Sequence, residues 1–257
     1  MFVVALTRFS PAGPLEGEVG ALAPVLGVGA YELRLSLAAT PPVVLWTGNE
    51  LDAAKSVLAL LRGRGHGAVA CDAASVASSD AMASPRSFSF TPDGLDDFRY
   101  ADMLALLVAT HVRHEETNEQ HTEKKLSLSR AALSGGLVLS KKSTVSKQSS
   151  SEEREPVLYV MHRSGSGHLL LRAGSLRYTG LGERIGRTVH ENFQILVTLL
   201  RERAPKALFD DRLQKPRRGS LLAVSGTSRE RNIVSSNEAE TDLAAHLLTV
   251  AALQGQV

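Results

Sequence analysis

Cysteine is almost absent from this sequence, since Cys71 is the only one among 257 residues. A single cysteine excludes a disulfide within the chain, and with it the small secreted folds that disulfides hold together. We therefore predict a reducing compartment and a cytoplasmic location. Cys71 closes a short apolar run, which indicates a buried, inert thiol and not a nucleophile.

Long apolar runs and a strong net charge are also missing. No stretch approaches the roughly 18 apolar residues of a transmembrane helix, so no transmembrane segment is expected. The first nine residues lack the basic start of a signal peptide. The formal net charge is +2, too small to draw the whole molecule toward nucleic acid. Nucleic acid is therefore not an expected partner, whereas a membrane surface stays open as one.

Motifs for catalysis or cofactor binding are scarce as well. The chain has no Walker loop, no Cys-x-x-Cys pair and no paired-carboxylate motif. Ser164 and Ser166 lie in a Gly-Ser turn without a recognisable base nearby in the sequence, which favours a turn over a nucleophile. We predict no catalytic residue and no cofactor, and the balance favours a protein that is not an enzyme.

What the sequence does contain is an ordinary globular composition. Hydrophobic residues make up 43% and charged residues 22%, and the length suits one large domain or two small ones. The pattern of elements predicts two domains of the α+β class. The predicted divisions are a small α+β domain over 1–78, a linker over 79–86, a strand-rich domain over 87–207 and a basic, flexible tail over 208–257.

The first domain alternates short apolar strands with amphipathic helices. Asn49 is the predicted N-cap of the longest helix, with Asp52 in a capping-box position. The expected elements, in order, are a strand over 2–7, helices over 14–26 and 30–38, a strand over 43–46, a helix from 50 to about 62 and a strand over 68–71.

Residues 21–72 resemble the C-terminal domain of the bacterial ribosomal stalk protein and the similar fold of the ClpS protease adaptor. The residues that carry the resemblance are Leu26-Gly27-Val28-Gly29, Tyr31-Glu32, Pro41-Pro42, Ala53-Ala54-Lys55, Leu60-Leu61 and Arg64-Gly65. Both families use this fold to bind proteins, so the resemblance implies a protein-binding domain. Its candidate exposed contacts are Arg34, Arg62 and Arg64. The two short helices lack the lysines of the stalk family, so factor binding is not implied.

The second domain combines strands with one well-defined helix. Strands are expected over 87–91, up to His111, over 157–162 and over 168–178, and 140–156 reads as a polar exposed loop or a long, splayed hairpin end. Thr188 is the predicted N-cap of the helix, with Glu191 in a capping box. Strands followed by one C-terminal helix resemble the pleckstrin-homology-like architecture, some members of which bind phosphoinositides.

That second resemblance implies an alternative function, peripheral binding to anionic lipids. Basic side chains near a membrane surface attract anionic headgroups by about 1 kcal/mol each. The candidate lipid-binding residues are Lys124, Lys125, Arg130, Lys141, Lys142 and Lys147.

Three histidines form the candidate metal site: His111, His114 and His121, with two glutamates nearby in the sequence. On a helix the three would share one face and could hold zinc. On a strand, His111 and His114 would point to opposite faces. A metal-dependent enzyme is therefore a further alternative function.

The last segment is basic between Arg201 and Arg231 and becomes apolar again after Glu238. Arg217-Arg218-Gly219-Ser220 resembles a basic-directed phosphorylation site, which makes Ser220 a candidate for modification. A short helix is possible over 238–253, with Leu243 and Leu247 on one face. Taken together, the sequence favours a non-enzymatic protein-binding or adaptor protein whose partner is an unidentified protein.

Overall fold

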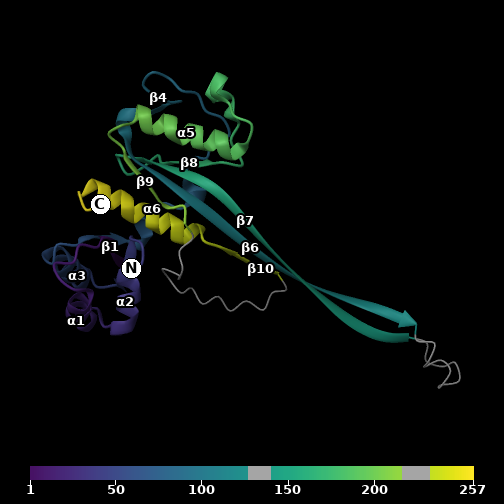
Figure 1. The fold of residues 1–257 in the computed structure, drawn as a ribbon, viewed down its shortest axis with the longest axis horizontal. Coiled ribbons are helices and arrows are strands. Elements are labelled where there is room, and N and C mark those ends of the chain that lie inside the picture. Colours follow the sequence, from purple (N-terminus) through teal and green to yellow (C-terminus); the bar gives the residue numbers. More distant parts are fainter. Residues whose placement is uncertain (127–139, 216–231) are drawn as a thin grey trace. The chain divides into compact units, whose positions relative to one another are not determined.

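The structure is a computed structural model that describes residues 1–126, 140–215 and 232–257 (Figure 1). The chain belongs to the α+β class, as predicted. Its described residues divide into two compact units. The first comprises 1–111, 155–215 and 237–257, and the second comprises 112–126, 140–154 and 232–236.

A three-stranded antiparallel sheet begins the first unit. Its order is β2-β1-β3, so the first strand lies in the middle. The strands are β1 (Phe2–Arg8), β2 (Val43–Gly48) and β3 (Gly67–Asp72), and the helices between them are α1 (Leu15–Leu26), α2 (Ala30–Ala38) and α3 (Leu51–Gly63). The six elements follow in the order that the sequence predicts. The predicted cap at Asn49 is wrong, because Glu50 is the N-cap of α3 and makes no side-chain capping bond.

Both faces of this sheet are covered. Val4 and Leu6 of β1 face the three helices and pack in one cluster with side chains such as Leu22. Ala5, the residue between them, packs on the opposite face with Leu247 of α6. This alternation follows from the two-residue period of a strand. It explains why β1 is apolar throughout, since a strand buried on both faces carries no polar stripe.

A mixed sheet follows, built around two long strands. Its order is β10-β6-β7-β8, and β9 also pairs with β6. The strands are β6 (Met103–Leu126), β7 (Ser140–His162), β8 (Leu169–Arg172), β9 (Leu208–Leu213) and β10 (Asn232–Ser236). In the first unit, β9 runs parallel to β6, and β8 runs antiparallel to β7. In the second unit, β10 runs antiparallel to β6.

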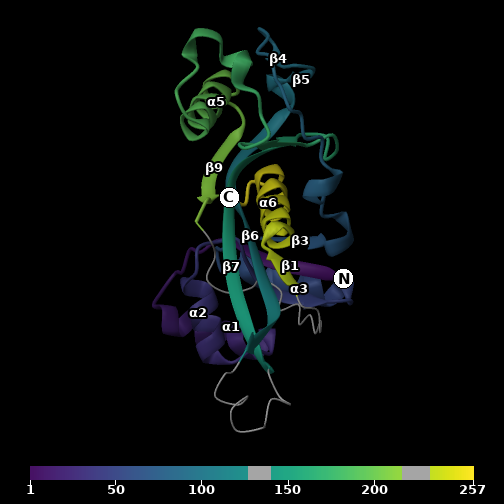
Figure 2. The same ribbon diagram turned by 90° about the vertical axis from the view of Figure 1, so that its right-hand side faces the viewer.

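Two helices cover this sheet within the first unit, α5 (Val189–Arg203) and α6 (Glu238–Leu253). Phe193 of α5 packs with Leu106 of β6 in one cluster, and Leu248 of α6 packs with Leu107 in another. Consecutive residues of β6 therefore face different helices. Because α6 also contacts β1 and β3, it is shared by both sheets (Figures 1 and 2).

Short elements complete the described chain. A two-stranded hairpin precedes β6, and four 3-10 turns connect the larger elements. They are β4 (Gly94–Leu95), β5 (Phe98–Arg99), η1 (Ala73–Ser75), η2 (Ser79–Ala81), η3 (Tyr100–Asp102) and η4 (Tyr178–Arg184).

Several segments differ from the sequence-based prediction. Residues 140–156, one of whose predicted forms was a loop, belong to β7. The strand expected over 168–178 ends at Arg172, because residues 173–175 turn and η4 follows. Residues 208–213, assigned to a tail, form β9 because β6 offers a free edge far away in the sequence. The helix expected over 238–253 is confirmed as α6.

The segment expected to link two domains, 79–86, is packed in the first unit. Ser79 is 4% exposed and Met82 is 8% exposed. The backbone NH of Leu170 in β8 donates to the carbonyl of Ala83. The linker prediction rested on the small and polar side chains of this segment. In the structure these side chains contact buried partners instead.

Among the described residues, no single helix has the length and apolar character needed to cross a membrane. Helices α1 and α2 reach that threshold only when they are counted together, and the chain bends by 118° between them.

Candidate functional site

Helix α5 begins at Thr188, as predicted. The Thr188 hydroxyl accepts a hydrogen bond from the backbone NH of Glu191 at 3.1 Å. The Glu191 carboxylate in turn accepts from the backbone NH of Arg187 at 2.9 Å, one residue before the position of a standard capping box. The first bond satisfies a free NH group of the first helical turn, and the second fixes the residue that precedes the cap.

The buried face of helix α5 is wider than the predicted core stripe. The predicted core stripe is confirmed at Phe193, Leu196 and Leu200, which are fully buried. Val189, also predicted for that stripe, is 53% exposed instead, because it is the first helical residue and lies at the edge of the core. A second apolar pair, Ile195 and Leu199, is spaced four residues apart and lies outside the predicted stripe. Leu199 is 6% exposed and belongs to the buried core cluster, and Ile195 is partly buried against it, so the pair forms the outer edge of the buried face of α5.

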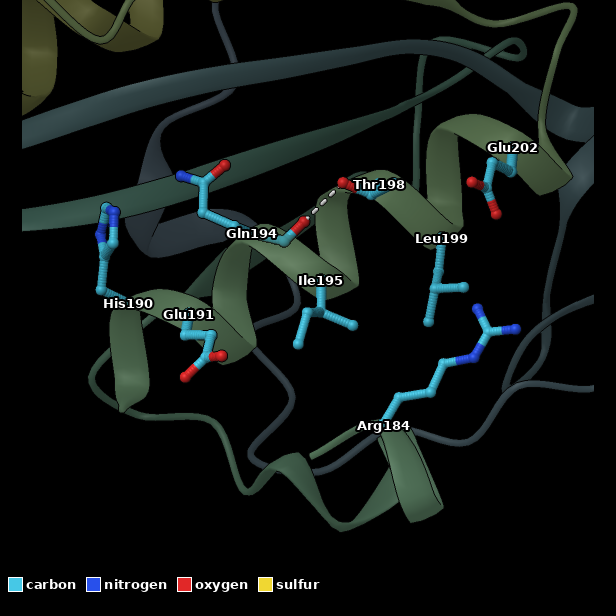
Figure 3. A pocket seen from close by; sticks show the side chains of 8 residues that line it. All are labelled: Arg184, His190, Glu191, Gln194, Ile195, Thr198, Leu199 and Glu202. Atoms are coloured by element: carbon cyan, nitrogen blue, oxygen red, sulfur yellow. Dashed lines mark hydrogen bonds between the residues drawn. The ribbon is translucent and has the colours of Figure 1, made fainter. Parts of the chain in front are cut away.

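The pair forms the floor of an open groove between α5 and η4, which we call the α5–η4 groove. Figure 3 shows Ile195 and Leu199 pointing from α5 toward the side on which Arg184 of η4 lies. The cavity volume is about 480 Å³. The lining residues are Arg184, His190, Glu191, Gln194, Ile195, Thr198, Leu199 and Glu202.

The second wall of the groove is held in place by the core. Tyr178 and Leu181 of η4 are buried in the same cluster as the inner face of α5. Gly180 approaches Phe88 so closely that an added Cβ would lie 2.2 Å from the Phe88 carbonyl oxygen. Glycine is therefore needed at position 180, and η4 cannot shift to close the groove without disturbing buried contacts.

Most polar side chains at the rim of the groove have no hydrogen-bond or ion-pair partner among the described residues. The Thr198 hydroxyl donates to the carbonyl of Gln194 at 2.8 Å, and Glu191 is used at the helix start. In the part of the chain that the structure describes, the side chains of Arg184, His190, Gln194 and Glu202 make no hydrogen bond or ion pair. Two opposite charges, Arg184 and Glu202, thus lie beside an apolar floor without partners there.

Two exposed apolar side chains lie next in sequence to residues that line the groove. Ile185, which directly follows η4, is 52% exposed, and Val189 is 53% exposed. A groove with an apolar floor and a polar rim is typical of sites that bind proteins or ligands. None of its described lining residues is a nucleophile with a partnered base.

A second group of polar side chains is buried in the first unit. We call Ser79, His111, Tyr159 and Asp242 the buried polar network, since none is more than 5% exposed. The Tyr159 hydroxyl donates to Asp242 Oδ1 at 2.7 Å and lies 2.7 Å from His111 Nε2. Ser79 donates its backbone NH to Asp242 Oδ2 at 2.8 Å and its hydroxyl to Oδ1.

The partners of His111 define its tautomer. Arg172 Nη1 lies 3.2 Å from His111 Nδ1, and because a guanidinium only donates, Nδ1 must accept. Nε2 then carries the proton and donates to the Tyr159 hydroxyl, which in turn donates its hydrogen bond to Asp242. Burial lowers the pKa of His111, an effect that Glu238 and Asp242 oppose and Arg172 reinforces. Burial also raises the pKa of Tyr159, as does the carboxylate of Asp242.

The buried polar network is not a hydrolytic triad, although it contains a serine, a histidine and an aspartate. The Ser79 hydroxyl donates to Asp242 and to neither nitrogen of His111, so no base is placed to activate it. All four side chains are closed to solvent. Its hydrogen bonds connect η2, β6, β7 and α6, so the network stabilises the fold.

The hydroxyl of Ser164 has a base nearby after all, because His162 Nδ1 lies 2.7 Å away. The same nitrogen accepts the backbone NH of Ser164 at 3.0 Å. No described carboxylate contacts the His162 ring, which packs against Phe98. The pair thus stabilises the exposed turn after β7 and lacks the third group of a catalytic arrangement.

The three predicted metal ligands have different surroundings. His111 belongs to the buried polar network, whereas the His114 side chain is 51% exposed and lies 3.5 Å from Glu152. The side chain of His121 lies outside the described residues. Within 1–114, 151–215 and 235–257, where side chains are described, no group of three or more histidines, cysteines or carboxylates is placed to hold a metal ion.

The three predicted protein contacts also differ. Arg64 donates to the buried carboxylate of Glu18 at 2.7 Å, and Arg62 donates to the carbonyl of Ala68 at 2.9 Å and to Gln254. Both guanidinium groups are therefore engaged within the fold. Arg34 is 58% exposed and pairs with Glu16 at 3.3 Å, so it remains accessible.

The remaining predicted site residues lie outside the described side chains. They are Lys124, Lys125, Arg130, Lys141, Lys142 and Lys147 for lipid binding and Ser220 for phosphorylation.

Sequence reasoning missed the α5–η4 groove. The four-residue spacing of Ile195 and Leu199 indicates only a wider buried face, because the groove depends on where η4 lies. No protein-family model matches the chain, and comparisons with curated proteins and with solved structures give no match. The geometry of the groove is therefore the basis for a functional proposal.

Proposed function

We propose that this chain is a protein-binding module that holds a short amphipathic segment of a partner protein in the α5–η4 groove. The single observation that carries the proposal is the open α5–η4 groove of about 480 Å³, whose apolar floor is formed by the partly buried Ile195 and the edge of the buried Leu199. Each Å² of apolar surface that a ligand buries there stabilises the complex by roughly 25 cal/mol. The resemblance of residues 21–72 to protein-binding folds supports the same class of function by analogy.

The dimensions of the groove favour a helical ligand. Its lining residues on α5 run from His190 to Glu202. At 1.5 Å per residue, these positions span about 18 Å, or three helical turns. An amphipathic helix binds such grooves through apolar side chains at positions i, i+3 or i+4, and i+7. The expected ligand therefore presents two apolar side chains one turn apart to the groove floor.

The charges at the rim restrict which side chains the ligand can carry. Neither Arg184 nor Glu202 has an ion-pair partner among the described residues. A carboxylate on the ligand would therefore pair with Arg184, and a cation on the ligand would pair with Glu202. The expected segment thus combines an apolar pair with one acidic and one basic side chain. This mixed charge separates it from a purely basic or purely acidic peptide.

Selection of peptides tests the proposal directly. A displayed library of random 16-residue peptides is selected on the full chain, and enriched peptides are synthesised and titrated by fluorescence anisotropy. We expect Ile195→Glu to weaken their binding at least tenfold, because it places a charge in the apolar floor. Arg184→Glu should weaken only the peptides that carry the acidic residue.

The matched control is Leu253→Glu, which makes the same change at a side chain of α6 that is 53% exposed and outside the groove. It should leave binding unchanged. Circular dichroism of each variant confirms that the fold is retained. Enriched peptides that bind Ile195→Glu as tightly as the unchanged chain would refute the groove as the site.

A further inference from the structure

Helix α2 exposes apolar side chains on the side away from the core. Leu33 and Leu37 are buried at 2% and 3% exposed, whereas Tyr31 and Leu35 are 73% and 56% exposed. Val25 and Val28, which precede the helix, are 57% and 36% exposed. We call Val25 of α1, Val28 of the connection, and Tyr31 and Leu35 of α2 the α2 outer face.

The α2 outer face is a consequence of helical geometry and not of a frayed helix. With about 100° per residue, Leu35 lies roughly 40° from Tyr31, and Leu33 lies about 200° away. The helix is therefore apolar on two opposite sides. The inner side covers the sheet, and the outer side gains nothing from the fold. An exposed apolar stripe such as Tyr31–Leu35 is typical of an interaction site.

Opposite charges flank the outer side of α2. On the same helical wheel, Glu32 lies about 80° to one side of the Tyr31–Leu35 stripe and Arg34 about 80° to the other. The Glu32 carboxylate has no ion pair within the part of the chain that the structure describes. Arg34 pairs with Glu16 at 3.3 Å, but both side chains are more than half exposed, so this pair is weak and easily exchanged.

We propose that the α2 outer face binds the same face of a second copy of this chain, with the two α2 helices pointing in the same direction. A two-fold axis parallel to the helices places the Arg34 side of one copy against the Glu32 side of the other. Two ion pairs then flank an apolar seam built from Tyr31 and Leu35. Helices pointing in opposite directions would bring Arg34 against Arg34 and Glu32 against Glu32.

The interface is small, which determines how the dimer behaves. Four apolar side chains per copy bury less than the roughly 800 Å² per partner of a standard stable interface. The dimer is therefore reversible, and its population rises with protein concentration. This inference does not depend on the α5–η4 groove, whose residues belong to other elements.

Sedimentation velocity over a range of concentrations tests the dimer. The unchanged chain should shift from monomer toward dimer as its concentration rises. Tyr31→Glu combined with Leu35→Glu should keep it monomeric, since the seam then carries four charges. Leu253→Glu, the same change at an exposed apolar residue of α6, should leave the dimer intact. A chain that stays monomeric at millimolar concentration would overturn the proposal.

Exchange of charges tests the orientation of the helices. Glu32→Arg or Arg34→Glu alone should raise the dissociation constant at least fivefold, because each creates like-charged contacts. The double variant, Glu32→Arg with Arg34→Glu, should restore it to within twofold. Failure of the double variant to recover would overturn the same-direction arrangement.

The two binding sites are separable in these experiments. Ile195→Glu should leave dimerisation unchanged, and Tyr31→Glu with Leu35→Glu should leave peptide binding unchanged. A negative result in one assay therefore carries no consequence for the other site.

Discussion

At the scale of single residues, the burial of His111 makes the stability of the fold depend on pH. Its side chain is 4% exposed, and its ring is held between Arg172 and Tyr159. Other charged groups that face it are Glu155 on β7, which contacts Arg172, and Glu238 and Asp242 on α6. Burial lowers the pKa of His111 below its ordinary value of 6.5.

A lowered histidine pKa makes the fold less stable in acid. In the unfolded chain, His111 binds a proton near pH 6.5, whereas in the folded chain it binds one only at a lower pH. The free energy of unfolding therefore falls as the pH drops below 6.5, and it stops falling once the pH is below the pKa of the folded state. Burial lowers the pKa of His168 and His246 as well, which adds to the same trend. We expect the urea midpoint of unfolding to fall between pH 7.5 and pH 5.5.

His111→Asn isolates the contribution of this ring. It should lower stability at pH 7.5, since hydrogen bonds are lost, but it should flatten the dependence on pH. His190→Asn, at an exposed position of α5, serves as the control and should leave the slope unchanged. An unaltered slope in His111→Asn would contradict the assignment.

At the scale of elements, one glycine inside α1 and the glycine that caps its end have different roles. Gly27 ends the helix with φ +66°, a left-handed conformation that other residues adopt only at a cost. Gly20 lies inside the helix with no positive φ, and an added Cβ would meet no atom within 4 Å at either position. The two sites therefore differ in backbone conformation and not in packing.

Alanine should have opposite effects at these two positions. Gly20→Ala should stabilise the fold by about 0.5–1 kcal/mol, because alanine restricts the unfolded chain and favours helix. Gly27→Ala should destabilise it by about 1 kcal/mol, because a Cβ is strained at that φ. Chemical denaturation measures both, and a loss of stability from Gly20→Ala would show that α1 does not have this conformation.

Prediction from the sequence worked best where local chemistry decides the structure. The start of α5 at Thr188 follows from its capping oxygen, and the extent of α6 follows from apolar side chains such as Leu243 and Leu247 at helical spacing. Prediction failed where segments that are far apart in the sequence pair with each other. The edge at which β9 pairs with β6 lies about a hundred residues earlier, and no local pattern records it.

The candidate site shows the same limit. Ile195 and Leu199 looked like ordinary helix residues, because only the position of η4 turns them into the floor of a groove. The buried polar network was invisible for a related reason. Ser79, Tyr159 and Asp242 come from three distant segments, and each alone is an ordinary polar residue.

At the scale of the whole molecule, α6 joins the two sheets of the first unit. Leu247 packs with Ala5 and Val69 of the N-terminal sheet, and Leu248 packs with Leu107 of the second sheet. Neither sheet can lose α6 without exposing a buried face. We therefore expect the two sheets to unfold together, although the sequence suggested separate domains.

Two spectroscopic signals test that coupling. The fluorescence of Trp46, the only tryptophan, reports on the N-terminal sheet, and the near-ultraviolet circular dichroism of buried Tyr159 and Tyr178 reports on the second. Leu247→Ala should destabilise the fold by about 2–5 kcal/mol and shift both curves equally. Two transitions with different midpoints would contradict a shared unit.

The position of α6 in the sequence also has a consequence for synthesis. Strands β1 and β3 leave the ribosome long before α6 does, by on the order of ten seconds at 5–20 residues per second. During that interval one face of the sheet, including Ala5 and Val69, has no cover. The nascent chain must carry an exposed apolar surface until α6 emerges, and general chaperones are the expected means of protecting it.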